Sequence, residues 1–133
     1  MIVVDSNVIA YLYLPQGEPT AARRARELDP AWAAPALWRS EFRNVLALHM
    51  RHREVSLASA VVAQAEAEAL LAGHEYEVDS ARVLALAAAS GRTAYDCEFV
   101  AVAQALGVHL VTSDWQVLAS FPGVAVSLRD FAA

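Results

Sequence analysis

The first seven residues, Met1–Asn7 (MIVVDSN), constrain the fold of this chain more than any other stretch. Ile2–Val4 is a run of β-branched residues, which predicts a short buried strand. Asp5 follows at once, and the next residues, Asn7–Leu14, predict a helix that Asp5 or Ser6 caps. A strand that is apolar on both faces must be covered on both sides, so the rest of the chain has to supply helices for each face of its sheet.

Predicted helices and apolar strands alternate along the remaining sequence. Helices are expected at Pro19–Leu28, Leu37–Arg53, Leu57–Ala72, Ser80–Ser90, Ala94–Leu106, Asp114–Phe121 and Leu128–Phe131. Strands are expected at Val108–Thr112 and Val124–Ser127, with a weaker candidate at Trp32–Ala34 and a linker or strand at His74–Val78. This order predicts a three-layer α/β/α sandwich around a central, mostly parallel sheet of about four to five short strands. The chain shows no internal repeat, low-complexity stretch or domain boundary, so residues 1–133 are expected to form one domain.

Composition excludes several classes of protein. Hydrophobic residues make up 57% of the chain and charged residues 19%, which excludes a disordered protein. No apolar run reaches the roughly 20 residues of a membrane span, and no basic segment precedes the first apolar residues, so neither a membrane protein nor a signal peptide is expected. Cys97 is the only cysteine and cannot form an internal disulfide, which favours a reducing, cytoplasmic setting.

Charge is distributed unevenly along the chain. The formal net charge is −5, yet all ten basic residues are arginines, and seven of them lie between Arg23 and Arg53. Five acids accompany those seven arginines, so residues 1–53 carry +2 and the remainder carries −7. A basic half permits binding of an anionic polymer despite the negative total, and solvated helix faces are the alternative explanation.

Four carboxylates stand where burial should exclude them. Asp5 and Asp114 directly follow predicted strands, at the carboxyl ends where open parallel sheets place their ligand crevice. Asp96 lies in the first turn of a helix whose later residues are almost all apolar. Glu41 interrupts an apolar stripe at helical spacing. The other members of that stripe are Leu37, Val45 and Leu48.

Each of these acids also has a purely structural explanation. Asp5 and Asp114 are placed to cap helices, Asp96 has capping-box spacing with Thr93, and Glu41 can pair with an arginine. Together these explanations weaken, because clustered carboxylates raise one another's pKa unless a cation neutralises them. Oxygen ligands alone select a hard ion, Mg²⁺ or Mn²⁺. Such an ion activates water and neutralises charge on a phosphodiester, which fits this set of acids.

Four ordered motifs resemble those of the PIN-domain nucleases, and most closely the toxin half of VapBC toxin–antitoxin pairs. They are Asp5-Ser6-Asn7, Glu41 with Asn44, Tyr95-Asp96, and the run Leu110–Asp114. The resemblance spans nearly the whole chain. It implies a PIN-like fold and a Mg²⁺- or Mn²⁺-dependent ribonuclease that hydrolyses RNA phosphodiester bonds. It also implies a homodimer, inhibited by a small antitoxin protein that wraps the early helices and inserts a segment into the acidic site.

The same resemblance assigns roles to individual residues. The four acids of the family fall on Asp5, Glu41, Asp96 and Asp114, as catalytic residues and metal ligands. Supporting roles fall on Ser6, Asn7, Asn44, Thr112 and Ser113, with Ser6 and Asn7 expected to orient Asp5 or a metal-bound water. Glu98 is not one of the four positions, and we expect it to support the site from outside or to face a partner.

Other side chains carry weaker hypotheses. Arg39 and Arg43 flank Glu41 and are either clamps for RNA phosphates or simply solvated. The acidic stretch from Glu66 to Asp79 would face solvent or a basic antitoxin segment. Core packing is favoured over catalysis for Cys97. Core or dimer packing is favoured over base stacking for the aromatic residues Tyr11, Tyr13, Trp32 and Trp38, and a zinc site is disfavoured for His49 and His52.

The sequence therefore predicts a metal-dependent endoribonuclease of the toxin type. Two alternatives belong to other classes. One is a PIN-like module that binds RNA or protein without cleaving it, and the intact set of four acids argues against that alternative. The other is a metal-dependent phosphohydrolase that acts on another class of substrate, against which the arginine-rich half argues weakly.

Overall fold

Five parallel strands form the central sheet of the protein, which a computed structural model describes over residues 1–133. The strands are β1 (Ile2–Val4), β2 (Trp32–Pro35), β3 (Glu75–Tyr76), β4 (Leu110–Thr112) and β5 (Ala125–Ser127). Eight helices connect and cover them. The helices are α1 (Ser6–Tyr13), α2 (Pro19–Leu28), α3 (Trp38–Arg51), α4 (Leu57–Leu70), α5 (Ser80–Ser90), α6 (Ala94–Leu106), α7 (Trp115–Ser120) and α8 (Leu128–Phe131).

The opening strand lies at the centre of the sheet. The strand order is β3-β2-β1-β4-β5, and Val3 pairs with Ala33 on one side and with Leu110 on the other. Val3 and Val4 are completely buried, as expected of a strand that is covered on both faces. Every strand runs in the same direction, so the carboxyl ends of β1 and β4 meet at one edge of the sheet.

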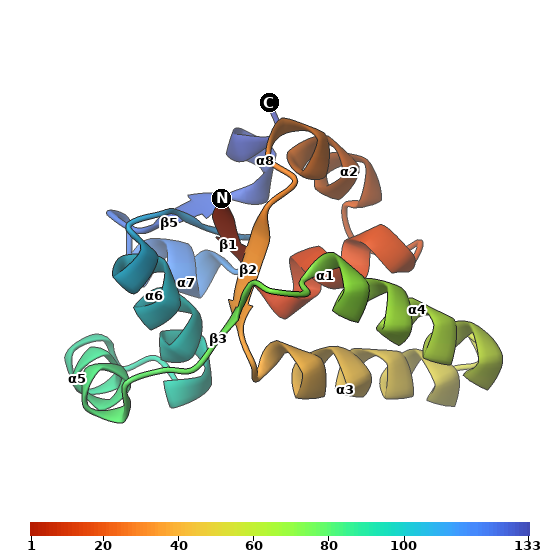
Figure 1. Ribbon diagram of the computed structural model, residues 1–133, viewed down its shortest axis with the longest axis horizontal. Coiled ribbons are helices and arrows are strands. Elements are labelled where there is room, and N and C mark those ends of the chain that lie inside the picture. Colours follow the sequence, from red (N-terminus) through yellow and green to blue (C-terminus); the bar gives the residue numbers. More distant parts are fainter.

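Helices cover both faces of this sheet (Figure 1). On one side α6 packs on β1, β2 and β4, and α5 packs on the outside of α6. On the other side α1 contacts β4, α2 and α3, while α3 and α4 lie side by side and extend away from the sheet. This arrangement confirms the predicted α/β/α sandwich.

The buried face of α3 differs from the predicted stripe. Trp38, Phe42 and Leu46 are the residues of this helix that enter the core, whereas Leu48 is 46% exposed. The prediction that Leu48 belongs to a buried stripe is therefore wrong. Trp38 and Phe42 stack on each other with ring centroids 6.2 Å apart, and burying two large rings rotates the helix by one residue relative to the predicted stripe. Glu41 consequently lies at the boundary of the core rather than within it.

Smaller differences concern the ends of elements. The segment His74–Val78 contains the two-residue strand β3, which settles the choice between linker and strand. β4 begins at Leu110, two residues later than predicted, because Gly107 adopts a left-handed conformation and the Val108 amide donates back to Ala103 at the end of α6. None of the helices combines the length and the apolar character needed to cross a lipid bilayer.

Candidate active site

An open cleft with a volume of about 450 Å³ lies at the carboxyl ends of β1 and β4. All four predicted acids contribute to its wall: Asp5, Glu41, Asp96 and Asp114. These residues are up to 109 positions apart in the chain, and the parallel sheet brings them together at one edge. The rest of the wall is formed by Ser6, Asn7, Leu37, Ser40, Asn44, Val45, Tyr95, Phe99, Leu110, Thr112 and Val117.

Asp5 is held at the junction of β1 and α1. Its Oδ1 accepts a hydrogen bond from the Val8 amide at 2.9 Å and so caps α1. Its Oδ2 accepts from the hydroxyl of Thr112, at the end of the neighbouring strand. Burial raises the pKa of Asp5 to about 6, although both hydrogen bonds act in the opposite direction. The negative charges of Asp114 and Glu41 also raise this pKa, which shows that the acids act on one another.

Thr112 links the ends of the two central strands. Its hydroxyl donates to Asp5, and the same oxygen accepts from the Asp114 amide at 3.0 Å. Asp114 caps α7, where its Oδ1 accepts from the Gln116 amide at 2.8 Å. Thr112 is almost completely buried, so the positions of both acids depend on a hydroxyl that solvent cannot replace.

Ser6 fixes the third acid from the start of α1. Its hydroxyl donates a hydrogen bond of 2.8 Å to Oε1 of Glu41, which lies on α3. Ser6 is expected from the sequence to orient Asp5 or a metal-bound water, and in the structure its hydroxyl bonds to Glu41 rather than to Asp5. Burial raises the pKa of Glu41, and the charges of Asp96 and Glu98 add to the effect. Glu98 therefore lies near enough to Glu41 to influence it without forming part of the cleft wall.

Asp96 is presented by the first turn of α6. The Thr93 hydroxyl caps this helix by accepting from the Asp96 amide at 3.1 Å. Burial raises the pKa of Asp96, and the charge of Asp114 raises it further, while the positive charge of Arg92 acts in the opposite direction. The four carboxylates thus form one mutually repelling group, which a bound cation would stabilise.

The donor set fits a hard divalent cation. Every ionisable residue in the cleft wall apart from Tyr95 is a carboxylate, and no histidine or cysteine lies there. Carboxylate oxygens suit Mg²⁺ and Mn²⁺ and disfavour softer metals. No three acidic, histidine or cysteine side chains close into a preformed metal cage. Mg²⁺ commonly binds through one or two carboxylates and retains water, so an open group of acids suits it.

Comparison with known proteins agrees with this geometry. A family model described as the PIN domain matches residues 2–123. The chain belongs to the PIN-domain family. It is 32% identical over 126 residues to Ribonuclease VapC3 of Pyrobaculum aerophilum, an alignment that covers 92% of this chain and 96% of that protein.

Solved structures share the fold of this PIN domain. The crystal structure of PAE2754 from Pyrobaculum aerophilum superposes with a TM-score of 0.77 at 24% identity, covering 98% of this chain and 92% of that one. A toxin–antitoxin complex from Klebsiella pneumoniae contains a chain that matches with a TM-score of 0.67 at 19% identity. That match covers 96% of this chain and 98% of the other, so the likeness extends over the whole fold.

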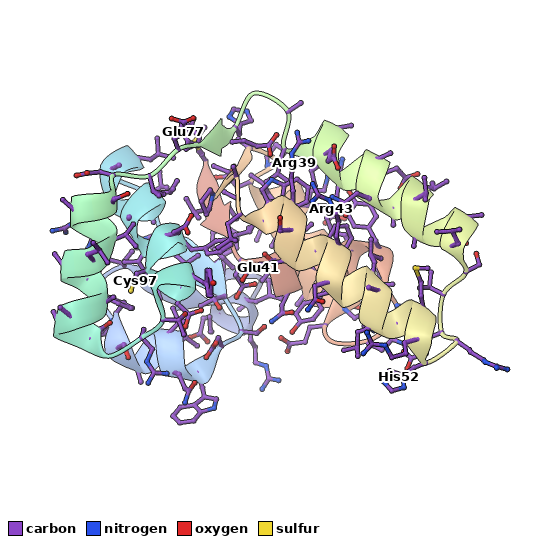
Figure 2. All side chains as sticks on the ribbon, turned by 90° about the horizontal axis from the view of Figure 1, so that it is seen from below. Arg39, Glu41, Arg43, His52, Glu77 and Cys97 are labelled. Atoms are coloured by element: carbon purple, nitrogen blue, oxygen red, sulfur yellow. The ribbon has the colours of Figure 1, made fainter.

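The two arginines beside Glu41 lie outside the cleft of this PIN domain. Figure 2 shows Arg39 and Arg43 on the side of α3 that faces α4, whereas Glu41 lies on the opposite side. Arg39 donates to both carboxylate oxygens of Glu75 at 2.7 Å and to Glu68 at 2.8 Å. Arg39 thus forms ion pairs that join α3 to α4 and β3, an arrangement that neither a phosphate clamp nor a simply solvated side chain describes. Arg43 borders a groove between α3 and α4, away from the acids.

The aromatic residues considered for base stacking are engaged elsewhere. Trp32 and Trp38 are completely buried. Tyr13 packs against Phe42, with ring centroids 5.9 Å apart. The Tyr11 hydroxyl forms a hydrogen bond of 2.9 Å with Ser113, which is not among the residues that line the cleft.

Two exposed aromatic residues without an assigned role directly adjoin acids of the site in the chain. Tyr95 is 61% exposed and forms part of the cleft wall, and Trp115, next to Asp114, is 73% exposed. Helical spacing gives no clear signal for Trp115, because Leu118, three positions further along α7, packs against the core.

The side chains disfavoured as alternative centres do not line the cleft. Cys97 is buried beside Val83 and Ala101, and Figure 2 shows it next to α5, away from Glu41. His49 is bonded through Nδ1 to the Val45 carbonyl at 2.9 Å, and His52 lies at the far end of α3 (Figure 2). Neither histidine belongs to a metal-binding group.

Proposed function

We propose that this PIN domain is a Mg²⁺- or Mn²⁺-dependent endoribonuclease that hydrolyses RNA phosphodiester bonds. The observation that carries this proposal is the convergence of Asp5, Glu41, Asp96 and Asp114 in one cleft, with burial and mutual repulsion raising the pKa of the first three. Helix capping by Asp5 and Asp114 does not explain the whole group, since each buried carboxylate costs free energy unless a cation is present. The ribonuclease named among its relatives supports the same activity.

The four acids would hold the cation, and their neighbours would keep them in position. A divalent ion supplies Lewis-acid chemistry here, neutralising charge on the scissile phosphate and making water acidic enough to attack it. Thr112 fixes Asp5 relative to Asp114, and Ser6 fixes Glu41. Asn7 and Asn44 are exposed in the cleft wall and offer amide groups to the phosphate or the sugar.

We further propose that the protein is the toxin of a toxin–antitoxin pair. The supporting observation is its fold, which it shares with a chain of a toxin–antitoxin complex. A cognate antitoxin protein would bind it, and a homodimer is the expected oligomeric state. The cytoplasm, where cellular RNA is available, is the expected location.

Cleavage of a mixed RNA pool by the purified protein tests the enzymatic proposal. We expect Mn²⁺-stimulated cleavage that excess EDTA abolishes and that Asp96→Asn reduces by at least ~100-fold, because removing a charged ligand weakens ion binding. Asp130→Asn is the matched control, since Asp130 is an exposed aspartate of α8 outside the cleft, and it should cleave like the unmodified protein.

Full activity in EDTA or in Asp96→Asn would contradict the proposal. Calorimetry with Mn²⁺ separates the alternatives. A folded protein that binds RNA but no Mn²⁺ would be a non-cleaving module. Hydrolysis of small phosphate esters with no cleavage of RNA would indicate a metal-dependent phosphohydrolase of another substrate class.

A further inference from the structure

Two large aromatic side chains stand in solvent beside the acids of the cleft. Tyr95 directly precedes Asp96, and Trp115 directly follows Asp114. Their exposed fractions, 61% and 73%, are among the largest of any bulky apolar side chain in the protein. Burying an aromatic ring stabilises a protein more than burying most side chains does, so exposed rings next to a cleft point to an interaction surface.

Tyr95 is positioned to reach a substrate in the cleft, and Trp115 adjoins the cleft residue Asp114 in the chain. Tyr95 lies in the cleft wall itself, in the first turn of α6. Trp115 is the first residue of α7, the helix that Asp114 caps. In RNA a scissile phosphate joins two nucleotides, so a phosphate held at the acids brings its flanking sugars and bases to the residues that adjoin those acids.

The side chains of the cleft wall do not attract RNA by charge. The wall contains four carboxylates and no arginine or lysine. Arg92 is the cation that acts on Asp96, and its Nε is buried without a hydrogen-bond partner. One arginine offsets only part of the negative charge. Stacking of bases on aromatic rings provides attraction that does not depend on charge.

We propose that Trp115 and Tyr95 form a base-stacking platform that binds unpaired nucleotides on either side of the scissile phosphate. This inference rests on the proposed ribonuclease function and names two residues that would bind the nucleotides flanking the scissile phosphate. Bases inside an A-form duplex stack on one another and present no free face, so a duplex cannot use the platform. Stacking tolerates any base, and the platform therefore sets a preference for strandedness rather than for sequence.

The tryptophan content of the chain provides a direct measurement. Of the three tryptophans, Trp32 and Trp38 are completely buried and Trp115 is exposed, so quenching of tryptophan fluorescence by an added oligonucleotide reports on Trp115. The measurement uses the full chain carrying Asp96→Asn, which keeps the RNA intact, and a short single-stranded RNA of mixed sequence. We expect quenching by this RNA, and little quenching by the same strand with abasic sites or by its duplex.

Substitutions at Trp115 test whether RNA binding requires a planar ring at this position. Trp115→Phe retains a ring and Trp115→Leu retains apolar bulk without one, which makes them a matched pair. We expect Trp115→Leu to weaken RNA binding by about 5- to 100-fold, the range for losing one stacked base, and Trp115→Phe to recover most of the affinity. In the cleaving protein, Trp115→Leu should raise KM and leave kcat nearly unchanged, because stacking stabilises the bound substrate and the transition state equally.

The possible results separate this inference from the proposed function. Equal affinity of the Phe and Leu variants, or no quenching by single-stranded RNA, would overturn the platform while cleavage by the unmodified protein stands. Quenching by a protein partner but not by RNA would assign the two rings to a protein interface instead. RNA binding through Trp115 in a protein that never cleaves would support the platform and overturn the nuclease.

Discussion

At the scale of single residues, Asp5 combines two roles that compete for the same carboxylate. One oxygen caps α1 through the Val8 amide, and the other accepts from Thr112. A carboxylate offers about four lone pairs, so each oxygen keeps one available for a cation. Capping and metal binding are therefore compatible at this position. The raised pKa of Asp5 means that, without a cation, keeping this carboxylate charged lowers the free energy of unfolding.

We expect Asp5→Asn to stabilise the metal-free protein at about pH 7. The pKa of Asp5 is about 6 in the folded state, above its unfolded value of about 3.9. The folded state then holds the proton more strongly, so this contribution to stability is present below about pH 4 and lost as the pH rises through about 6. The free energy of unfolding falls by up to about 3 kcal/mol for this reason. Asparagine does not ionise and still caps α1, so Asp5→Asn should avoid this loss.

Urea denaturation in EDTA at several pH values measures this effect. The unmodified protein should lose stability between about pH 4 and about pH 7 more steeply than Asp5→Asn does. Asp130→Asn, at an exposed position, serves as the control and should follow the unmodified protein. A lower free energy of unfolding for Asp5→Asn at about pH 7 would show that Asp5 stabilises the fold instead.

Thr112 is a positioning residue whose effect passes through two acids. We expect Thr112→Val, which keeps the shape and removes the hydroxyl, to lower cleavage by about 10- to 100-fold, as the loss of groups that orient metal ligands commonly does. Thr112→Ser restores the hydroxyl and should recover most of the activity. An increase in the Mn²⁺ concentration needed for half-maximal rate distinguishes mispositioned ligands from a general loss of folded protein. Normal Mn²⁺ dependence in Thr112→Val would exclude this role.

At the scale of elements, α3 uses three sides for three different contacts. Its inner face, with Trp38, Phe42 and Leu46, packs into the core. A neighbouring stripe with Glu41 faces the cleft, and Arg39 on another side joins the helix to β3 and α4. Periodicity placed Glu41 correctly on a helix but misjudged which face is buried, because two aromatic rings outweigh the aliphatic stripe in buried area.

The corrected face of α3 can be tested by a pair of substitutions. Phe42 is completely buried, so Phe42→Ala should lower the free energy of unfolding by about 3–5 kcal/mol. Leu48 is 46% exposed, so Leu48→Ala should change it by less than about 0.5 kcal/mol. Chemical denaturation of the two variants decides between the two faces. Comparable losses in both would restore the stripe predicted from the sequence.

At the scale of the whole molecule, the cleft exists because distant elements meet at one edge of the sheet. β1 and β4 carry Asp5 and Asp114 on neighbouring strands, α3 brings Glu41 from one face, and α6 brings Asp96 from the other. A cation bound there would connect both helical layers through the sheet. Ion binding and global stability should therefore be coupled.

We expect Mn²⁺ to raise the midpoint of thermal unfolding of the unmodified protein. The gain in the free energy of unfolding should approach about 2.7 kcal/mol when free Mn²⁺ exceeds its dissociation constant about 100-fold. Asp96→Asn should show a much smaller rise, while Asp130→Asn responds like the unmodified protein. Equal rises in all three proteins would place the ion outside the cleft.

Much of this protein follows from the sequence because its signals are local. The strand–acid–helix junctions at Asp5 and Asp114, the capped helix that carries Asp96, and the order of the four acids depend on neighbouring residues and predict both the sandwich and the family. Local pattern also indicated which edge of the sheet holds the site, since all parallel strands end there.

Only the tertiary structure decided how those acids are held. Ser6 bonds to Glu41 across 35 positions and Thr112 to Asp5 across 107, and Arg39 is taken up by Glu68 and Glu75 rather than left for a phosphate. The exposure of Trp115 was decided in the same way, by which side of a short helix meets the core. A hydrogen bond between distant segments and the exposure of one ring both depend on where whole elements pack. Residue spacing within a segment carries no information about how that segment packs against the others.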